Sequence, residues 1–225
     1  MKPALAPLGA CLLALSACQQ PAHLAQSIVQ APAPERVARE SPGLKTAIFA
    51  GGCFWGVEGV FSHVKGVTGA VSGYHGGTRR QARYDLVATG LTDHAEAVAV
   101  TYDPAQVRYD ELVRIFFSVV VDPTLRNRQG PDEGTHYRTA LIPLDAEQRA
   151  VAAAYLDQME ASRLWDAPIV AAIEPYRAFY PAEDRHQDFA ARNPGHGYVL
   201  RWDRPRIAAL ERLYPRLHRA ASARD

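Results

Sequence analysis

Hydrophobic and polar positions alternate along this chain with periods that change from segment to segment. Residues 45–50 form a β-type run, and after two glycines the apolar residues recur three and four positions apart, which is a helical spacing. Residues 67–74 and 95–102 are further β-type runs. The second of these is apolar at both alternating sets of positions except at Glu96 and the far end, as in a strand covered on both faces. The pattern therefore places Glu96 in a dry environment.

Later segments predict more helices and shorter strands. A helix opens at Asp110 and carries an apolar stripe to residue 120, and Asp145 is the expected N-cap of a helix that ends near residue 162. A last amphipathic stripe covers residues 205–217. Other expected segments are short strands at 139–142 and 168–173, a long polar loop at 122–137 and a polar-aromatic turn with a short helix at 179–191. This order predicts an α+β fold, a two-layer sandwich with a ferredoxin-like core and extended loops.

The N-terminal segment predicts export. Residues 1–17 combine a positive start with a short apolar core and small residues, as in a signal peptide, and they are too short for a comfortable membrane-spanning helix. Residues 15–18 (Leu-Ser-Ala-Cys) resemble the lipobox of bacterial lipoproteins, which implies cleavage before Cys18 and its lipidation; a plain signal peptide is the alternative. Residues 18–43, rich in Ala, Pro, Gln and Arg, are expected to be a flexible tether to a catalytic domain at 44–225. The expected location is the cell envelope, facing the periplasm or exterior.

Composition limits the possible partners. With 48% hydrophobic and 22% charged residues the chain is an ordinary globular protein, and a net charge of +1 provides no field that attracts nucleic acid. The chain has three cysteines, Cys11, Cys18 and Cys53. Cleavage would remove the first and lipidation would consume the second, so Cys53 would be the only free thiol.

Cys53 stands where the first strand meets the first predicted helix. In the first helical turn, free N–H groups and the positive end of the dipole would favour a thiolate. Phe54 and Trp55 place aromatic rings beside the sulfur. The interpretation is a reactive cysteine beside an apolar pocket, and the alternative is an inert buried cysteine.

A thiolate that attacks an electrophilic centre bearing an oxygen needs groups that protonate or hydrogen-bond that oxygen. Glu96 is the first candidate, because desolvation raises the pKa of a carboxyl group and keeps its proton near neutral pH. Tyr84 and Tyr137 are candidate hydroxyl donors, and Asp132 is positioned to orient or polarise. Each of these residues also has a structural alternative, namely a core aromatic or a structural salt bridge.

Other functions fit less well but remain open at this point. His94 and Glu96 match part of a zinc deaminase motif, but the required Pro-Cys-x-x-Cys is missing, and no metal-ligand spacing is found. A cysteine hydrolase would need a base histidine at Cys53. A thiol peroxidase would share a sulfenic acid intermediate. A tethered binding or structural module is the non-enzymatic alternative.

Three motifs, in order along the chain, resemble the peptide methionine sulfoxide reductase A family. They are residues 52–56 (Gly-Cys-Phe-Trp-Gly), residues 94–98 (His-Ala-Glu-Ala-Val) and residues 127–132 (Asn-Arg-Gln-Gly-Pro-Asp) followed by Tyr137. The segment 179–187 also matches, and the resemblance covers about residues 46–217. It implies thiol-dependent reduction of the (S)-epimer of methionine sulfoxide, free or in proteins, and so repair of oxidised proteins.

The resemblance also implies roles for single residues. Cys53 would attack the sulfur and become a sulfenic acid. Residues matching Glu96, Tyr84 and Tyr137 would bind and protonate the oxygen, and the residue matching Asp132 would support them through water. Phe54 and Trp55 would hold the methyl group, with no metal or organic cofactor.

The chain departs from many relatives because no cysteine follows Cys53, so the usual resolving cysteine is absent. We therefore expect an external reductant, either a thioredoxin-like protein or a small thiol. The other expected partners are oxidised methionine proteins and, through Cys18, a lipid bilayer, and the expected state is a monomer. Two smaller departures, Val121 in place of a histidine and Arg185 in place of an aromatic residue, concern local packing.

Overall fold

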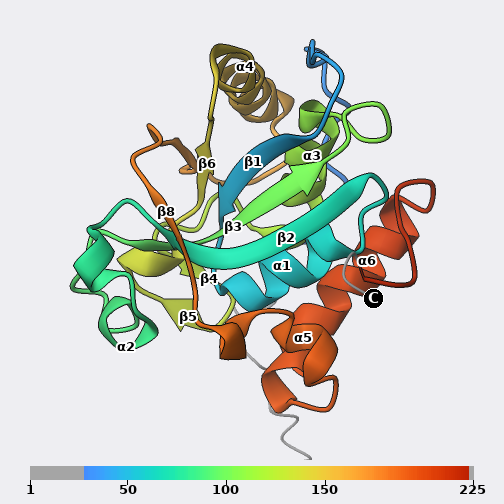
Figure 1. Ribbon diagram of the computed structural model, residues 1–225. Coiled ribbons are helices and arrows are strands. Elements are labelled where there is room, and N and C mark those ends of the chain that lie inside the picture. The colour runs from blue at the N-terminus through green and yellow to red at the C-terminus, as the bar shows by residue number, and fades with distance from the viewer. Residues whose placement is uncertain (1–27, 223–225) are drawn as a thin grey trace, which may run out of the picture.

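The computed structural model describes residues 28–222, and the expected signal peptide and Cys18 lie outside them (Figure 1). The α-helices are α1 (Phe54–Ser62), α2 (Tyr84–Val87), α3 (Tyr109–Ile115), α4 (Ala146–Ser162), α5 (Phe189–Arg192) and α6 (Arg204–Leu213). The strands are β1 (Lys45–Ala50), β2 (Val67–His75), β3 (Ala95–Tyr102), β4 (Arg128–Gln129), β5 (Asp132–Glu133), β6 (Ala140–Ile142), β7 (Ala172–Ile173) and β8 (Phe179–Pro181). Short 3₁₀ turns are η2 (Arg79–Gln81), η4 (Thr135–Tyr137) and η5 (Asp184–His186), and π-helical turns are η3 (Phe116–Val120) and η6 (Val199–Asp203).

The main sheet has the strand order β7-β6-β1-β3-β2-β8. Its centre, β6-β1-β3-β2, is antiparallel throughout, and β3 lies between β1 and β2, which α1 connects. A βαβ unit split in this way by an antiparallel strand is the ferredoxin-like arrangement. The predicted α+β fold is therefore confirmed.

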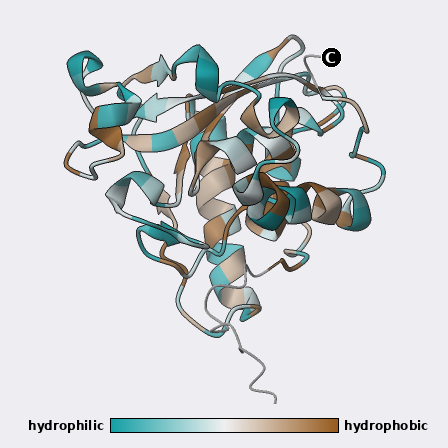
Figure 2. Cartoon of the chain, turned by 90° about the horizontal axis from the view of Figure 1, so that it is seen from below, coloured by the Kyte–Doolittle hydropathy of each residue, from teal (hydrophilic) through white to brown (hydrophobic). Residues whose placement is uncertain are grey.

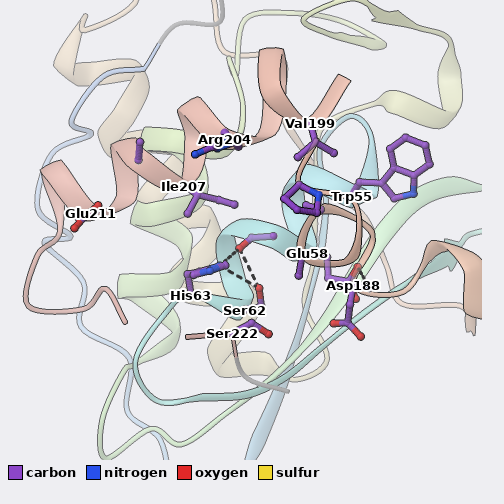
Figure 3. Close-up of a pocket in the computed structure, with 15 residues that line it drawn as sticks. Trp55, Glu58, Ser62, His63, Asp188, Val199, Arg204, Ile207, Glu211 and Ser222 are labelled. Carbon is purple, nitrogen blue, oxygen red and sulfur yellow. Dashed lines mark hydrogen bonds between the residues drawn. The ribbon is translucent and has the colours of Figure 1, made fainter. Parts of the chain in front are cut away.

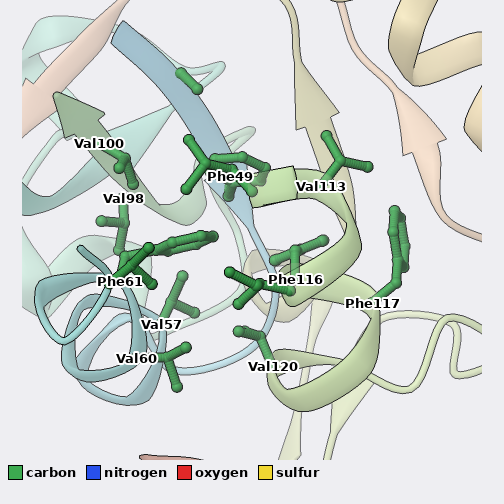
Figure 4. Packing of buried hydrophobic residues seen from close by; sticks show 14 of the residues in the cluster. Phe49, Val57, Val60, Phe61, Val98, Val100, Val113, Phe116, Phe117 and Val120 are labelled. Carbon is green, nitrogen blue, oxygen red and sulfur yellow. The ribbon is translucent and has the colours of Figure 1, made fainter. Parts of the chain in front are cut away.

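Large side chains fill the space between the sheet and its helices. Phe49 of β1 stacks on Phe61 of α1 with ring centroids 4.6 Å apart, and Phe116 of η3 packs on Phe49 at 5.2 Å (Figure 4). On the opposite face of the sheet, alanine and isoleucine side chains form a separate cluster: Ile48, Ala50, Ala95, Ala97, Ala140 and Ile142. Figure 2 shows hydrophobic residues gathered on the central segments and hydrophilic residues on the peripheral ones. Both faces of β3 are thus covered, as its sequence pattern predicts.

Several boundaries differ from the sequence-based expectations. Asp145 is the N-cap of α4, as predicted, and its carboxylate accepts the N–H of Gln148 at 2.8 Å. The expected strand at 168–173 shortens to β7, and part of the segment expected to be a turn is β8, which extends the sheet beside β2. The pairing of β8 depends on a distant strand, so the local pattern gives no sign of it.

The tether prediction is wrong for residues 28–43, which pack against the domain. Ala31 is fully buried and its N–H donates to Ser118 Oγ at 3.0 Å, and Glu40 accepts the hydroxyl of Tyr102 at 2.5 Å. These contacts tie the segment to η3 and β3 through specific hydrogen bonds rather than a continuous apolar stripe. Residues 18–27 lie outside the described part of the chain. Within that part, no helix is long and apolar enough to cross a bilayer.

Candidate active site

Cys53 lies at the turn between β1 and α1. Gly52 has φ +79°, a backbone conformation that favours glycine, and a Cβ there would lie 2.6 Å from the Gln129 side chain. Cys53 follows as the N-cap of α1, one position before the first helical turn in which it was expected. The residue is 7% exposed, so it is largely shielded from solvent.

Glu96 points from β3 toward the start of α1. It lies on the same face of the strand as Val98 and Val100, the face that packs under the helices, and it is 1% exposed. Its Oε2 accepts the backbone N–H of Phe54 at 3.0 Å. Burial raises the pKa of Glu96 to about 8, against the opposing effect of the Phe54 N–H. The carboxyl group therefore carries a proton at neutral pH.

The thiol of Cys53 is held neutral at rest, contrary to the expectation of a favoured thiolate. Burial raises the pKa of Cys53 well above its ordinary value, and the nearby carboxyl groups of Glu96, Asp203 and Asp132 raise it further. The backbone N–H of Trp55 acts in the opposite direction, as expected at a helix start, but it is outweighed. The helix start thus lowers the pKa of Cys53, as expected, but by less than burial and the carboxyl groups raise it.

The three other predicted polar residues come to the site from separate elements. Tyr84 is the first residue of α2, and Asp132 belongs to β5. Tyr137 is the last residue of η4. Burial raises the pKa of both tyrosines, and the charges of Glu96 and Cys53 raise it further, which places both hydroxyls near these two groups. The structure thus brings together residues that lie up to 84 positions apart in the sequence, from Cys53 to Tyr137.

Aromatic rings form one wall of the site. Phe54 is fully buried, while the half-buried Trp55 stacks on Phe189 with ring centroids 3.6 Å apart. The Trp55 indole N–H donates to Nδ1 of His186 at 3.2 Å. Because burial lowers the pKa of His186, its ring is neutral and able to accept this bond. His186 also lies 4.4 Å, between ring centroids, from Tyr84, so it supports the floor of the site.

Sequence reasoning missed a group of polar residues in the C-terminal segment. The Tyr198 hydroxyl donates to Asp132 Oδ2 in a short hydrogen bond. Asp203 and Arg206, both fully buried, form an ion pair behind α1. Tyr198 follows Gly197 in a glycine-rich stretch, a weak signal, and nothing in the sequence separates Arg206 from the exposed arginines of the same helix.

The two departures from the family pattern have ordinary packing partners. Val121 is fully buried, and its methyl group packs directly against Gly51. Arg185 is largely exposed, and its guanidinium lies over the Tyr84 ring, 5.9 Å from the centroid.

A cavity of about 420 Å³ lies along α1, between α5 and α6 (Figure 3). It borders Trp55 but does not include Cys53 or Glu96. The His94 of the partial deaminase motif is held by backbone groups, with Nε2 2.9 Å from the Thr78 carbonyl oxygen. Residues 28–222 contain no cluster of histidine, cysteine and acidic side chains able to hold a metal ion.

The arrangement combines a thiol, a protonated acid and phenol donors in a dry site. Such a set suits attack by sulfur on a centre whose bound oxygen gains negative charge and a proton as its bond weakens. Among the described residues, the charges that act most strongly on Cys53 are carboxylates rather than a histidine. His186, the histidine beside Phe54 and Trp55, uses its Nδ1 to accept the Trp55 N–H, so the hydrolase alternative gains no support from the site.

Known proteins resemble the chain over this whole region. A model of the family described as peptide methionine sulfoxide reductase matches residues 45–214. The chain is 51% identical over 180 residues to peptide methionine sulfoxide reductase MsrA 2 of Mesorhizobium japonicum, covering 80% of this chain and 92% of that protein. The MsrA 2 of Synechocystis is 50% identical, covering 79% of this chain and 83% of that protein.

Solved structures agree with the sequence comparisons. Reduced Mxr1 from Saccharomyces cerevisiae superposes with a TM-score of 0.62 at 30% identity, covering 72% of this chain and 92% of that one. Methionine sulfoxide reductase A of Corynebacterium diphtheriae gives a TM-score of 0.58 at 33% identity, covering 76% and 86%. The chain belongs to the peptide methionine sulfoxide reductase family, whose members reduce methionine sulfoxide to methionine and so repair oxidised proteins.

Proposed function

We propose that Cys53 attacks the sulfur of the (S)-epimer of methionine sulfoxide while Glu96 donates a proton to the oxygen. A bond forms between the two sulfurs as the thiol proton of Cys53 passes to the Glu96 carboxylate, which restores the acid. The S–O bond breaks as the oxygen, carrying the proton that Glu96 gave, moves to the Cys53 sulfur, and breakage of the S–S bond releases methionine and leaves a sulfenic acid. The thiol is thus oxidised and the sulfoxide reduced by two electrons. The observation that carries this proposal is the protonated, buried Glu96, hydrogen-bonded to the backbone N–H that directly follows Cys53.

The remaining site residues fit supporting roles. The hydroxyls of Tyr84 and Tyr137 are placed to donate hydrogen bonds to the sulfoxide oxygen, which becomes more basic as the S–O bond weakens. Asp132 supports them from β5 through water. Phe54 and Trp55 provide the apolar wall for the methyl group, since a methyl is stabilised by aromatic contact and excludes competing water.

The best test is incubation with each epimer of a blocked methionine sulfoxide plus dithiothreitol. We expect consumption of the (S)-epimer alone by the wild type and no turnover by Cys53→Ser, whose circular dichroism should match the wild type. Equal consumption of both epimers, or activity in Cys53→Ser, would refute the proposal.

An external thiol resets the enzyme in this scheme. The thiol attacks the sulfenic acid with release of water, and a second thiol then frees Cys53 from the mixed disulfide. Residues 54–225 contain no cysteine that could form a disulfide with Cys53, and this supports the proposal. A thioredoxin-like protein and a small thiol are both suitable reductants. Mass spectrometry after one turnover without reductant should show a single added oxygen, and an intramolecular disulfide would contradict the scheme.

The lipobox-like residues 15–18 support a membrane anchor in the cell envelope. We further propose that the enzyme is a monomer and acts there on oxidised proteins or free methionine sulfoxide. Cys18 and the packed segment that begins at residue 28 are ten residues apart, which span at most about 36 Å. The domain would therefore stay close to the bilayer. Incorporation of labelled palmitate that is lost in Cys18→Ser tests this anchor, and labelling of Cys18→Ser would contradict it.

A further inference from the structure

A buried ion pair stands directly behind the first turn of α1. Asp203, the last residue of η6, and Arg206 of α6 are both fully buried, with Arg206 Nη1 3.9 Å from Asp203 Oδ1. A Cβ on Gly56 would lie 2.5 Å from Asp203 Oδ1 and would overlap the guanidinium of Arg206. The pair therefore touches the backbone of the helix that begins at Cys53.

The same C-terminal segment enters the active site at its other end. Tyr198 directly precedes the π-helical turn η6, and its hydroxyl donates to Asp132. π-Helical turns occur often at functional sites, where they shift the side chains that follow. One short segment thus carries both the hydrogen-bond partner of Asp132 and the buried pair.

Arg206 balances the charge of this acidic site. Its guanidinium lies 3.9 Å from Asp203, the last residue of the η6 turn that Tyr198 directly precedes, and Tyr198 in turn contacts Asp132. From this position the guanidinium opposes the effect of burial on the pKa of Asp132, Tyr198 and Asp203. Burial still raises the pKa of Asp203 to about 7. A buried carboxylate without a nearby cation takes up a proton instead of staying charged. The charged and titratable groups that face Asp132 are Cys53, Glu96 of β3, Tyr84 of α2, Tyr137 of η4, Tyr198 and Asp203 of the η6 segment and Arg206 of α6.

We propose that Arg206 is a positioning residue whose buried guanidinium keeps Asp132 in the charged form that accepts the Tyr198 hydroxyl. Asp203 fixes the guanidinium in place against Gly56. With Asp132 charged, its bond to Tyr198 holds both side chains at the edge of the site. The inference rests on the proposed role of Asp132 in catalysis, and goes beyond it by assigning a function to the C-terminal helix.

The test compares pH profiles of kcat/KM for a blocked (S)-methionine sulfoxide. In Arg206→Met we expect the acid-side midpoint to move upward by about one pH unit or more, because an opposite charge shifts a carboxyl pKa by that amount. At one unit below the new midpoint, kcat/KM should be about tenfold below its plateau. Arg206→Lys, which keeps the charge, should restore much of the wild-type profile.

Asp203→Asn distinguishes positioning from simple structural support. Asparagine keeps the shape of Asp203 and an oxygen that can accept from the Arg206 guanidinium, but it removes the negative charge that is coupled to Asp132. The midpoint should therefore stay the same or fall, opposite to Arg206→Met. A merely structural pair would lower the melting temperature in both variants and leave both midpoints unchanged, which would overturn the proposal.

A removed partner can leave a buried charge that prevents folding. If Arg206→Met does not fold, the double variant Asp203→Asn/Arg206→Met is compared with Asp203→Asn, and it should have the higher midpoint. Equal midpoints would overturn the inference. Asp132→Asn separates the two proposals. If the acid limb of the wild-type pH profile persists in this variant, the proposed role of Asp132 is wrong. If the limb is lost in this variant but the Arg206 variants show no shift of the midpoint, only the inference about Arg206 is rejected.

Discussion

Replacing Glu96 with glutamine separates hydrogen bonding from proton donation at one buried position. The glutamine carbonyl oxygen can still accept the Phe54 N–H that Glu96 accepts at 3.0 Å, so the turn at Cys53 should be kept. Its amide has no acidic proton to give to the sulfoxide oxygen. We therefore expect the variant to fold and to lose about 10²- to 10⁴-fold in the rate of sulfoxide reduction.

The pH dependence of kcat/KM gives a second measure of how much the proton of Glu96 contributes to the reaction. Burial raises the pKa of Glu96 to about 8, so the acid is about 91% protonated at pH 7 and about 9% protonated at pH 9. If the protonated form is the active one, kcat/KM of the wild type should fall about tenfold between these pH values. In Glu96→Gln the residual activity should lack this alkaline limb.

The same substitution should have the opposite effect on simple alkylation of Cys53. The Glu96 carboxylate raises the pKa of this thiol, so its removal should increase the thiolate fraction at a given alkaline pH. Iodoacetamide labelling followed by mass spectrometry should therefore be faster in Glu96→Gln than in the wild type, while sulfoxide reduction, measured with dithiothreitol, is slower. A generally damaged site would lose both reactivities.

Glu58 provides a matched control. It is also a buried glutamate and belongs to α1 itself, but it accepts the Ser72 hydroxyl at 3.0 Å and lines the cavity between α5 and α6 rather than the site of Cys53. Glu58→Gln should keep the alkaline limb of the wild type. The acid assignment would be refuted if Glu96→Gln showed the same alkaline limb as the wild type, because another group would then be responsible for it.

Three other substitutions test separate parts of the molecule. Gly56→Ala places a Cβ on the buried ion pair behind α1, and thermal melts should show a loss of about 1–3 kcal/mol, the usual cost of overpacking; an unchanged melting temperature would mean that the pair is not fixed there. Tyr137→Phe removes one hydroxyl donor and should lower kcat on the order of tenfold to a hundredfold with little change in KM, measured by steady-state kinetics; a change confined to KM would assign Tyr137 to binding instead. Glu40→Gln weakens the bond that ties residues 28–43 to Tyr102, and urea unfolding should show a loss of about 1–3 kcal/mol; equal stability would mean that this bond contributes nothing.

The regular part of the fold could be predicted because its periods are local. Phe49 and Val98 alternate with small residues along strands that pair directly, so the sequence of each strand already shows which side faces the helices. Segment 28–43 could not be placed in this way. Ala31 is bound by the hydroxyl of Ser118, 87 positions away, and such single long-range hydrogen bonds leave no periodic pattern.

The candidate site likewise has residues that the local sequence identifies and residues that only long-range contacts bring into place. Cys53 and Glu96 stand out locally, one at a strand-to-helix turn and the other as a carboxyl group inside an apolar strand. Asp132 was a candidate because it lies on the same polar loop as Tyr137, and its supporting role through water came only from the family motif. Tyr198 and Arg206 were missed because a tyrosine and an arginine on a charged C-terminal segment are usually at the surface, and only the folded chain buries Arg206 fully and Tyr198 in part.

The raised pKa of the Cys53 thiol affects which oxidants react with the site. Oxidants such as peroxide react with thiolates, so a thiol whose pKa is raised by burial and by three carboxyl groups reacts poorly with them at rest. A sulfoxide differs because its oxygen can accept the proton of Glu96 and the hydrogen bonds of the tyrosines, which makes its sulfur more electrophilic. Attack by the neutral thiol then becomes favourable only when that oxygen is bound. The carboxyl groups that weaken Cys53 as a general nucleophile are, on this argument, the reason that it is selective for sulfoxide, and this favours the reductase over the thiol peroxidase alternative.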